Sequence, residues 1–170
     1  IIVITGSQDV FCAGTDDGAL TFGIQDSHFL NDLRVSDAIA AIEKPVVAAV
    51  NGDAIDQGLE IAMACDLRVA SNKALFGLTQ LEQNLIPWDG GTQRLPRLIG
   101  ISWATDMILS SRVLSAEEAE RVGLVNLVVD QKDVLSRAIE RATFISSYGP
   151  IATRDGNAAG LKGQDWPVEQ

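Results

Sequence analysis

Short apolar runs alternate with longer segments of helical periodicity along this chain. The runs at 1–5 (IIVIT) and 46–50 (VVAAV) carry no charge and are rich in β-branched side chains, so each predicts a buried strand. Two further strands are expected, at 66–71 and 124–129. Helices are expected at 58–65, 93–99, 102–110 and 133–147. This alternation of strands and helices predicts an α/β fold.

Polar residues mark one helix start and the end of the periodic region. Ser115 and Glu118 have the S-x-x-E spacing of a capping box, which predicts a helix from there to about Val122. The tail from Gly149 predicts a loop, or a helix that lacks a packing partner. No linker or shift in composition interrupts the chain before Tyr148, so we expect one domain up to that point.

Two strand-ending loops have the residues for an anion site. The strand at 46–50 leads into a helix whose first backbone N–H groups have no intrahelical partner and favour negative charge. Glu60 lies a few residues into that helix, so a carboxylate is held beside these donors. The strand at 1–5 precedes a second loop, in which Gly14 permits a tight turn. Two loop N–H groups that meet at one carbonyl oxygen would form an oxyanion hole, as enolate chemistry requires.

Six segments in a fixed order carry a family resemblance. They are 11–16 (FCAGTD), 44–52 (KPVVAAVNG), 64–71 (ACDLRVAS), 74–77 (ALFG), 90–100 (GGTQRLPRLIG) and 114–126 (LSAEEAERVGLVN). Together they resemble the enoyl-CoA hydratase/isomerase (crotonase) superfamily. The resemblance implies a spiral of strand–strand–helix repeats. It also implies a core over 1–150 that lacks the N-terminal hairpin region, and an incomplete C-terminal helical region that starts at 151–170.

The resemblance assigns the two oxyanion-hole N–H groups to Thr15 and Gln57. Gln57 lies in Asp56-Gln57-Gly58, where the family has three glycines, and side chains are unfavourable there if the backbone needs a positive φ. Asp56 is expected either to cap the helix and point away from the site, or to be an added catalytic group. Neighbouring residues of the two loops are expected to bind substrate: Ala13, Gly14, Asp16 and Gly58.

The remaining candidates are proton carriers and a pocket wall. Glu60 matches the first of two glutamates that family hydratases use, whereas Gln80 replaces the second and can position a water but not transfer a proton. Asp89 resembles an aspartate that several relatives use as base, acid or nucleophile, or else it caps the helix after it. Trp88 is expected either to wall a pocket for a cyclic acyl group or to serve in packing.

The composition limits the classes of molecule that the protein is expected to bind. A net charge of −10 and a pI of about 4.4 argue against nucleic acid and anionic membranes. No apolar run is long enough to span a bilayer. The two cysteines have no metal-like spacing and are expected to be free thiols in the cytoplasm, and no metal site is expected. The anionic coenzyme A moiety would need local positive charge, for which Arg68, Lys73 and Arg112 are candidates. His28 is expected at the surface.

The leading functional expectation is an enoyl-CoA hydratase, a hydro-lyase that acts on an acyl-CoA thioester. The first alternative is an enoyl-CoA isomerase, or a hydratase or hydrolase of cyclic acyl-CoA that uses Asp89. The second alternative is a non-catalytic, oligomer-forming relative. The resemblance implies no separate cofactor, because coenzyme A is part of the substrate, and it implies a homotrimer or a dimer of trimers.

Overall fold

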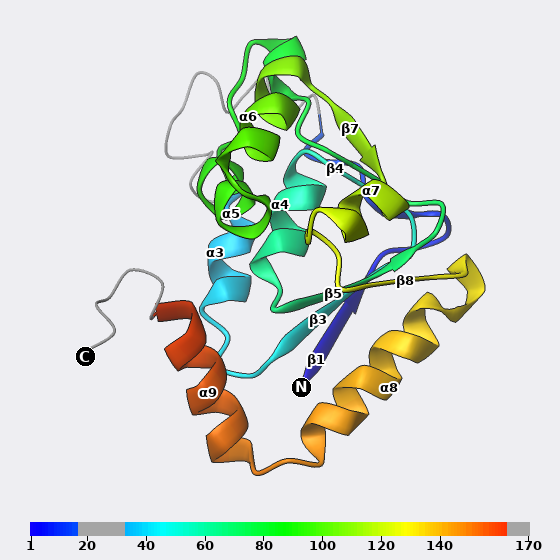
Figure 1. The fold of residues 1–170 in the computed structure, drawn as a ribbon, viewed down its shortest axis with the longest axis vertical. Helices are drawn as coiled ribbons and strands as arrows, with labels where there is room; N and C mark the ends of the chain where they lie inside the picture. Colours follow the sequence, from blue (N-terminus) through cyan, green and yellow to red (C-terminus); the bar gives the residue numbers. More distant parts are fainter. Residues whose placement is uncertain (17–32, 163–170) are drawn as a thin grey trace.

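The computed structural model describes residues 1–16 and 33–162, which form two sheets with helices around them (Figure 1). The first sheet is parallel, in the order β1 (Ile2–Thr5), β3 (Val46–Val50), β5 (Leu67–Ser71) and β8 (Leu127–Val129). The second has the order β2 (Val10–Cys12), β4 (Asp53–Ile55), β6 (Leu75–Gly77) and β7 (Val113–Ser115), with only β6 and β7 antiparallel. From β1 to β6, successive strands therefore alternate between the sheets, which confirms the predicted spiral.

Helices follow the strand pairs. They are α3 (Val35–Ala40), α4 (Gln57–Ala64), α5 (Gly91–Ile99), α6 (Ile101–Ser110), α7 (Ala116–Arg121), α8 (Val134–Ser146) and α9 (Pro150–Lys162), with short 3-10 turns η1 (Gln80–Gln83) and η2 (Gln131–Asp133). The predicted helices are confirmed to within two residues, and Ser115 and Glu118 form the capping box before α7. The tail from Pro150 is the helix α9, so of the two expectations for it the helix is confirmed and the loop is wrong. The expected strand at 124–129 begins only at Leu127, because Leu124 and Val125 are buried in the turn after α7.

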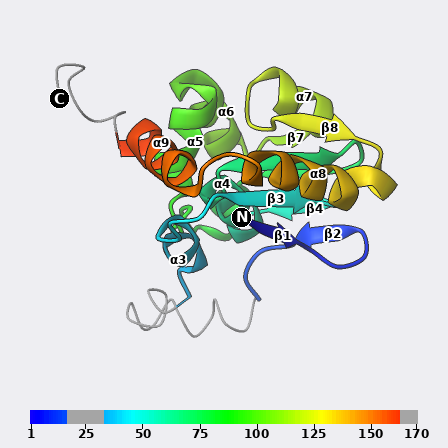
Figure 2. The same cartoon turned by 90° about the horizontal axis from the view of Figure 1, so that it is seen from below.

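The central strand β3 is buried on both faces, which explains its apolar sequence without alternation. Val46, Ala48 and Val50 belong to the cluster that includes Leu59 of α4 and Phe76 of β6. The alternate residues of β3 pack instead with α8, which runs alongside the first sheet (Figure 2). The sheet is thus held between α8 on one face and α4 on the other, and this fixes the position of the α4 N-terminus.

The basic residues considered for coenzyme A behave differently from one another. Arg68 is buried, and its guanidinium donates to the carbonyl oxygens of Leu124, Cys65 and Ala62. Its expected availability for a phosphate is therefore wrong. Arg112 pairs with two neighbouring carboxylates, of Asp106 and Glu118, and stacks over Trp103. Lys73 is exposed at the turn after β5, and His28 lies outside the described residues.

Two further expectations concern covalent and membrane features. Cys12 and Cys65 are both free thiols, and burial raises the pKa of Cys65 to about 11. Across residues 1–16 and 33–162, the helices are all too short or too polar to cross a membrane.

The first turn of α4 packs directly against the end of β2. A Cβ atom at Gly58 would lie 2.0 Å from the carbonyl oxygen of Cys12, so only glycine permits this approach. The contact joins the loop after β2 to the start of α4, and β2 and β4 run parallel beside it. Consequently the two loops that were expected to form the oxyanion hole lie at one edge of the second sheet.

We predict that Gly58→Ala lowers the free energy of unfolding by about 3 kcal/mol or more, because the added methyl group meets backbone rather than a movable side chain. Urea denaturation followed by circular dichroism measures this change. Gly156→Ala in α9 is the control, since no heavy atom outside its own helix lies within 4 Å of the added Cβ. Equal stability of the two variants would show that α4 can move away from β2 at no cost.

Candidate active site

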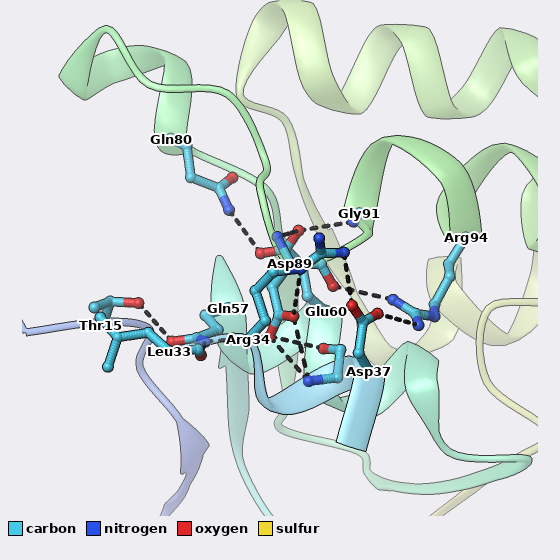
Figure 3. Close-up of polar contacts among 11 residues, drawn as sticks. Thr15, Leu33, Arg34, Asp37, Gln57, Glu60, Gln80, Asp89, Gly91 and Arg94 are labelled. Carbon is cyan, nitrogen blue, oxygen red and sulfur yellow. Dashed lines mark hydrogen bonds and ion pairs between the residues drawn. The ribbon is translucent and has the colours of Figure 1, made fainter. Parts of the chain in front are cut away.

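The two predicted oxyanion-hole residues are in direct contact. Thr15 follows β2 and Gln57 begins α4, and the Thr15 hydroxyl donates to Oε1 of Gln57 at 2.5 Å (Figure 3). Within the part of the chain that the structure describes, no protein group accepts from the backbone N–H of either residue. Both donors therefore remain available to an anionic oxygen, next to a side-chain contact that joins the loops carrying them.

Asp56 has an unusual backbone conformation just before α4. Its φ of 52° and ψ of −119° lie in a region that favours glycine. The family that the sequence resembles has a glycine at this position, so this conformation is expected there. Asp56 occupies the N-cap position, but its side chain makes no cap hydrogen bond, so the expected capping role is wrong. The carboxylate instead accepts from the backbone N–H of Thr79 at 2.5 Å and from its hydroxyl at 3.0 Å. Gly14, with φ 101°, packs against Asp56.

Glu60 is completely buried on the first turns of α4. Its Oε1 accepts from the backbone N–H groups of Asp89 at 2.9 Å and Gly91 at 2.7 Å. Burial raises the pKa of Glu60 to about 7, against the lowering effect of the Gly91 hydrogen bond, and the negative charges of Asp89 and Asp56 raise it further. A carboxyl with this pKa can accept or release a proton near neutral pH.

Gln80 faces the other oxygen of Glu60. Its Nε2 lies 3.4 Å from Glu60 Oε2, and the residue is only 5 % exposed on η1. Its Oε1 is buried and has no hydrogen-bond partner among the described residues. Buried side-chain oxygens normally accept a hydrogen bond from protein or water, so this atom marks a place for a donor beside Glu60.

Asp89 points away from Gln80 and toward α3. Its fully buried carboxylate accepts from the backbone N–H of Ser36 at 3.1 Å, from the Ser36 hydroxyl at 2.9 Å and from Nε2 of Gln57 at 3.2 Å. The expectation that it caps α5 is wrong, because Gly90 occupies that N-cap and no side chain caps it. Asp89 stabilises the N-terminus of α3 instead, from a segment more than 50 residues away in sequence.

A cavity of about 80 Å³ opens between the two loops and η1. Its lining residues are Ala13, Thr15, Asp56, Gln57, Gln80, Gln83, Leu85 and Trp88. Trp88 thus lies on the wall of this space, while Asp16 is exposed and Gly58 is buried against β2. The contributions of Gln83 and Leu85 to this lining, and of Thr79 to the position of Asp56, were not predicted from the sequence.

A larger cavity, of about 970 Å³, lies at the other end of α4, among α3, α5 and α9. Its lining mixes basic and acidic side chains and includes Arg68, but none of the predicted oxyanion-hole or proton-transfer residues. Size alone therefore does not identify the reactive place, whereas the orientation of Glu60 does. Over residues 1–16 and 33–162, histidine, cysteine and acidic side chains form no cluster of three that could hold a metal ion.

Comparisons with known proteins identify similar sequences and a similar fold. The sequence model of the family described as enoyl-CoA hydratase/isomerase matches residues 1–159. The chain is 40 % identical to a putative enoyl-CoA hydratase/isomerase, YngF, of Bacillus subtilis, over 95 % of this chain and 64 % of that protein. It is 38 % identical to a crotonyl-CoA hydratase of Syntrophomonas wolfei, over 100 % of this chain and 67 % of that relative.

A solved structure shares the fold. The crystal structure of an enoyl-CoA hydratase from Bacillus anthracis superposes with a TM-score of 0.93 at 38 % identity, covering 98 % of this chain and 66 % of that one. The chain thus spans about two thirds of the length of these proteins.

We predict that Asp56→Gly is more stable than Asp56→Ala by about 1–3 kcal/mol, because both variants lose the Thr79 hydrogen bonds but only glycine relaxes the positive φ. Urea denaturation of the two variants measures the difference. The matched pair at Asp133, also an N-cap but with φ −99°, should show a smaller advantage for glycine, from the N-cap preference alone. An equal advantage at both positions would mean that Asp56 is not strained.

Proposed function

The chain belongs to the enoyl-CoA hydratase/isomerase family, and from this premise we propose that it hydrates a short enoyl-CoA thioester. One observation carries the proposal: a buried glutamate with a pKa of about 7 faces a glutamine with an unpartnered oxygen, beside two loop N–H groups. This arrangement can hold a water next to a polarised thioester. Names of relatives alone would support the family but not the identity of the proton carrier.

The backbone N–H groups of Thr15 and Gln57 would donate to the thioester oxygen and stabilise the negative charge that develops on it. Glu60, as carboxylate, takes a proton from the bound water while the water oxygen bonds to the β-carbon. The enolate then receives that proton at the α-carbon from Glu60, so the net change is addition of one water. One carboxyl group serves both steps because its pKa lies near neutral pH.

Gln80 would orient the water during these reaction steps. A water that donates to Gln80 Oε1 and to Glu60 Oε2 satisfies the buried oxygen and is aimed by two groups. A glutamine amide cannot exchange protons at neutral pH, so Glu60 carries the proton chemistry. Asp89 is engaged by Ser36 and Gln57, and this geometry gives no support to reactions in which Asp89 moves protons.

Double-bond isomerisation is the second candidate, and one observation favours it. Moving a proton between two carbons needs a single carboxylate beside an oxyanion hole, and Glu60 is the one carboxyl here that faces Gln80. Incubation with crotonyl-CoA in heavy water, followed by mass spectrometry, separates the candidates. A mass gain of one heavy water supports hydration, whereas deuterium exchange without water addition supports isomerisation. An unchanged substrate would count against both and favour a non-catalytic relative.

The finer properties follow the same premise. We propose that the substrate is a coenzyme A thioester and that no separate cofactor is needed. We also propose that the protein is located in the cytoplasm and assembles as a homotrimer or a dimer of trimers. Support for self-association comes from large apolar side chains exposed on α6 and α8, namely Ile101, Leu109, Leu135, Ile139 and Phe144. Neither nucleic acid nor a membrane is proposed as a partner, given the net charge of −10.

We predict that Glu60→Gln lowers kcat for crotonyl-CoA hydration by about two to four powers of ten, because the proton carrier is removed. In the wild type, the rate should fall as the pH decreases through about 7, since the reaction starts from the carboxylate. Steady-state kinetics from acid to alkaline pH measure both effects. Glu82→Gln, the same change at an exposed position of η1, is the control; a rate unaffected by Glu60→Gln would remove Glu60 from the mechanism.

We predict that Gln80→Glu raises the hydration rate by about one to two powers of ten, because a second carboxyl supplies a separate acid and base. Two carboxyls at this distance share a proton, so one is protonated while the other is ionised. The rate is measured with crotonyl-CoA, with Gln131→Glu as a distant control of equal charge. A lower rate would mean that the amide of Gln80 is itself required.

A further inference from the structure

An unbroken series of hydrogen bonds joins the oxyanion-hole loop to the proton carrier (Figure 3). The Thr15 hydroxyl donates to Gln57 Oε1, and Gln57 Nε2 donates to Asp89 Oδ2. The backbone N–H of Asp89 in turn donates to Glu60 Oε1. Three segments of the chain, distant in sequence, are linked by this series.

Both hydrogens of the Gln57 side-chain amide are engaged by protein acceptors, and its oxygen accepts a hydrogen bond from Thr15. Its Nε2 carries two hydrogens, which go to the Leu33 carbonyl at 2.7 Å and to Asp89 at 3.2 Å, and its Oε1 accepts from Thr15. The residue is only 8 % exposed. A side chain in this state acts on its surroundings by fixing them, and the backbone N–H of the same residue is a proposed oxyanion donor.

Asp89 is held from several sides. Ser36 donates twice to its carboxylate, and Arg34 Nε approaches Oδ1 at 4.0 Å. The Arg94 guanidinium donates to its carbonyl oxygen at 3.0 Å. These contacts fix the backbone of Asp89, and its N–H is one of the donors that orient Glu60.

We propose that Gln57 and Asp89 form a buried polar bridge that holds the oxyanion-hole loops at a fixed distance from Glu60. Asp89 is a positioning residue in this arrangement, and the inference rests on the proposed function for its catalytic consequence. In a buried network, each bond that is lost leaves a partner unsatisfied, so removal of one member displaces the rest. In a turn made only of glycines, the main chain alone would hold these loops in place. Here the side chains of Gln57 and Asp89 hold them as well.

The charge of Asp89 also affects the pKa of Glu60. The charged groups that face Glu60 are Asp89, from the segment before α5, and Asp56, at the start of α4; both raise the pKa of Glu60. Arg34 of the α3 N-terminus and Arg94 of α5 lie beyond Asp89. Neutralising Asp89 therefore lowers the pKa of Glu60.

The first test is Asp89→Asn, with Asp133→Asn as the matched control on the far side of the protein. NMR titration of the protein labelled with ¹³C at glutamate carboxyls reports the Glu60 midpoint, which is assigned by its absence in Glu60→Gln. We expect the midpoint to move to lower pH in Asp89→Asn only. The pH dependence of crotonyl-CoA hydration should move with it, while kcat falls about tenfold to a hundredfold and KM changes little.

The second test uses the other end of the bridge and needs no change in Asp89. Thr15→Val removes the hydroxyl but keeps the shape and the backbone N–H, so we expect kcat to fall about threefold to tenfold. Thr15→Ser restores a hydroxyl and should recover most of that loss. This pair decides the matter if Asp89→Asn does not fold.

The outcomes are distinct. An unchanged Glu60 midpoint in Asp89→Asn, or equal rates for Thr15→Val and wild type, would overturn the bridge. Loss of the pH-dependent limb in Asp89→Asn would overturn it too, by making Asp89 the proton carrier. A wild type that processes no acyl-CoA, together with a lowered Glu60 midpoint in Asp89→Asn, would support the bridge while rejecting the proposed function.

Discussion

The carboxyl group of Glu60 lies in the interior, with backbone N–H donors from Asp89 and Gly91 on one of its oxygens. Desolvation outweighs these two hydrogen bonds, and the pKa of Glu60 rises to about 7. The contact dictates the local sequence, because a Cβ at Gly91 would lie 2.8 Å from Glu60 Oε1. The segment before α5 and the turn η1 both contact this carboxyl on α4. The burial of Glu60 therefore constrains the positions of all three elements.

The start of α4 shows a different balance. At Asp56, a side chain is present although the backbone conformation favours glycine, and hydrogen bonds from Thr79 offset the strain. At Gln57, the added side chain is absorbed by the bridge to Thr15 and Asp89. Both departures from a glycine-rich turn are therefore compensated by polar contacts that a glycine could not make. The result is a helix N-terminus whose donors are held by side chains as well as by the backbone.

The sequence predicts the long elements of this fold and misses most of the short ones, for physical reasons. β3 and α8 have enough residues for their apolar pattern to be distinct, whereas β2, β4, β6 and β7 have three residues each, too few to show a period. β8 also has three residues, but the apolar residues Leu124 and Val125 before it lengthen its run. The residues that motif position assigns to the site, Thr15, Gln57, Glu60 and Gln80, lie close together in the structure. The direction of Asp89 could not be predicted, because its partner Ser36 is 53 residues away and no local rule links them.

The chemistry depends on having one mobile proton. Hydration needs a group that first takes a proton from water and then reaches the α-carbon, while isomerisation needs only transfer between two carbons. The raised pKa of Glu60 is compatible with both. Gln80 separates them: its buried Oε1 has no hydrogen-bond partner among the described residues, and a substrate C–H group would not satisfy it, whereas a water would. The cost of leaving that oxygen unpaired is what favours a bound water, and with it hydration, at this site.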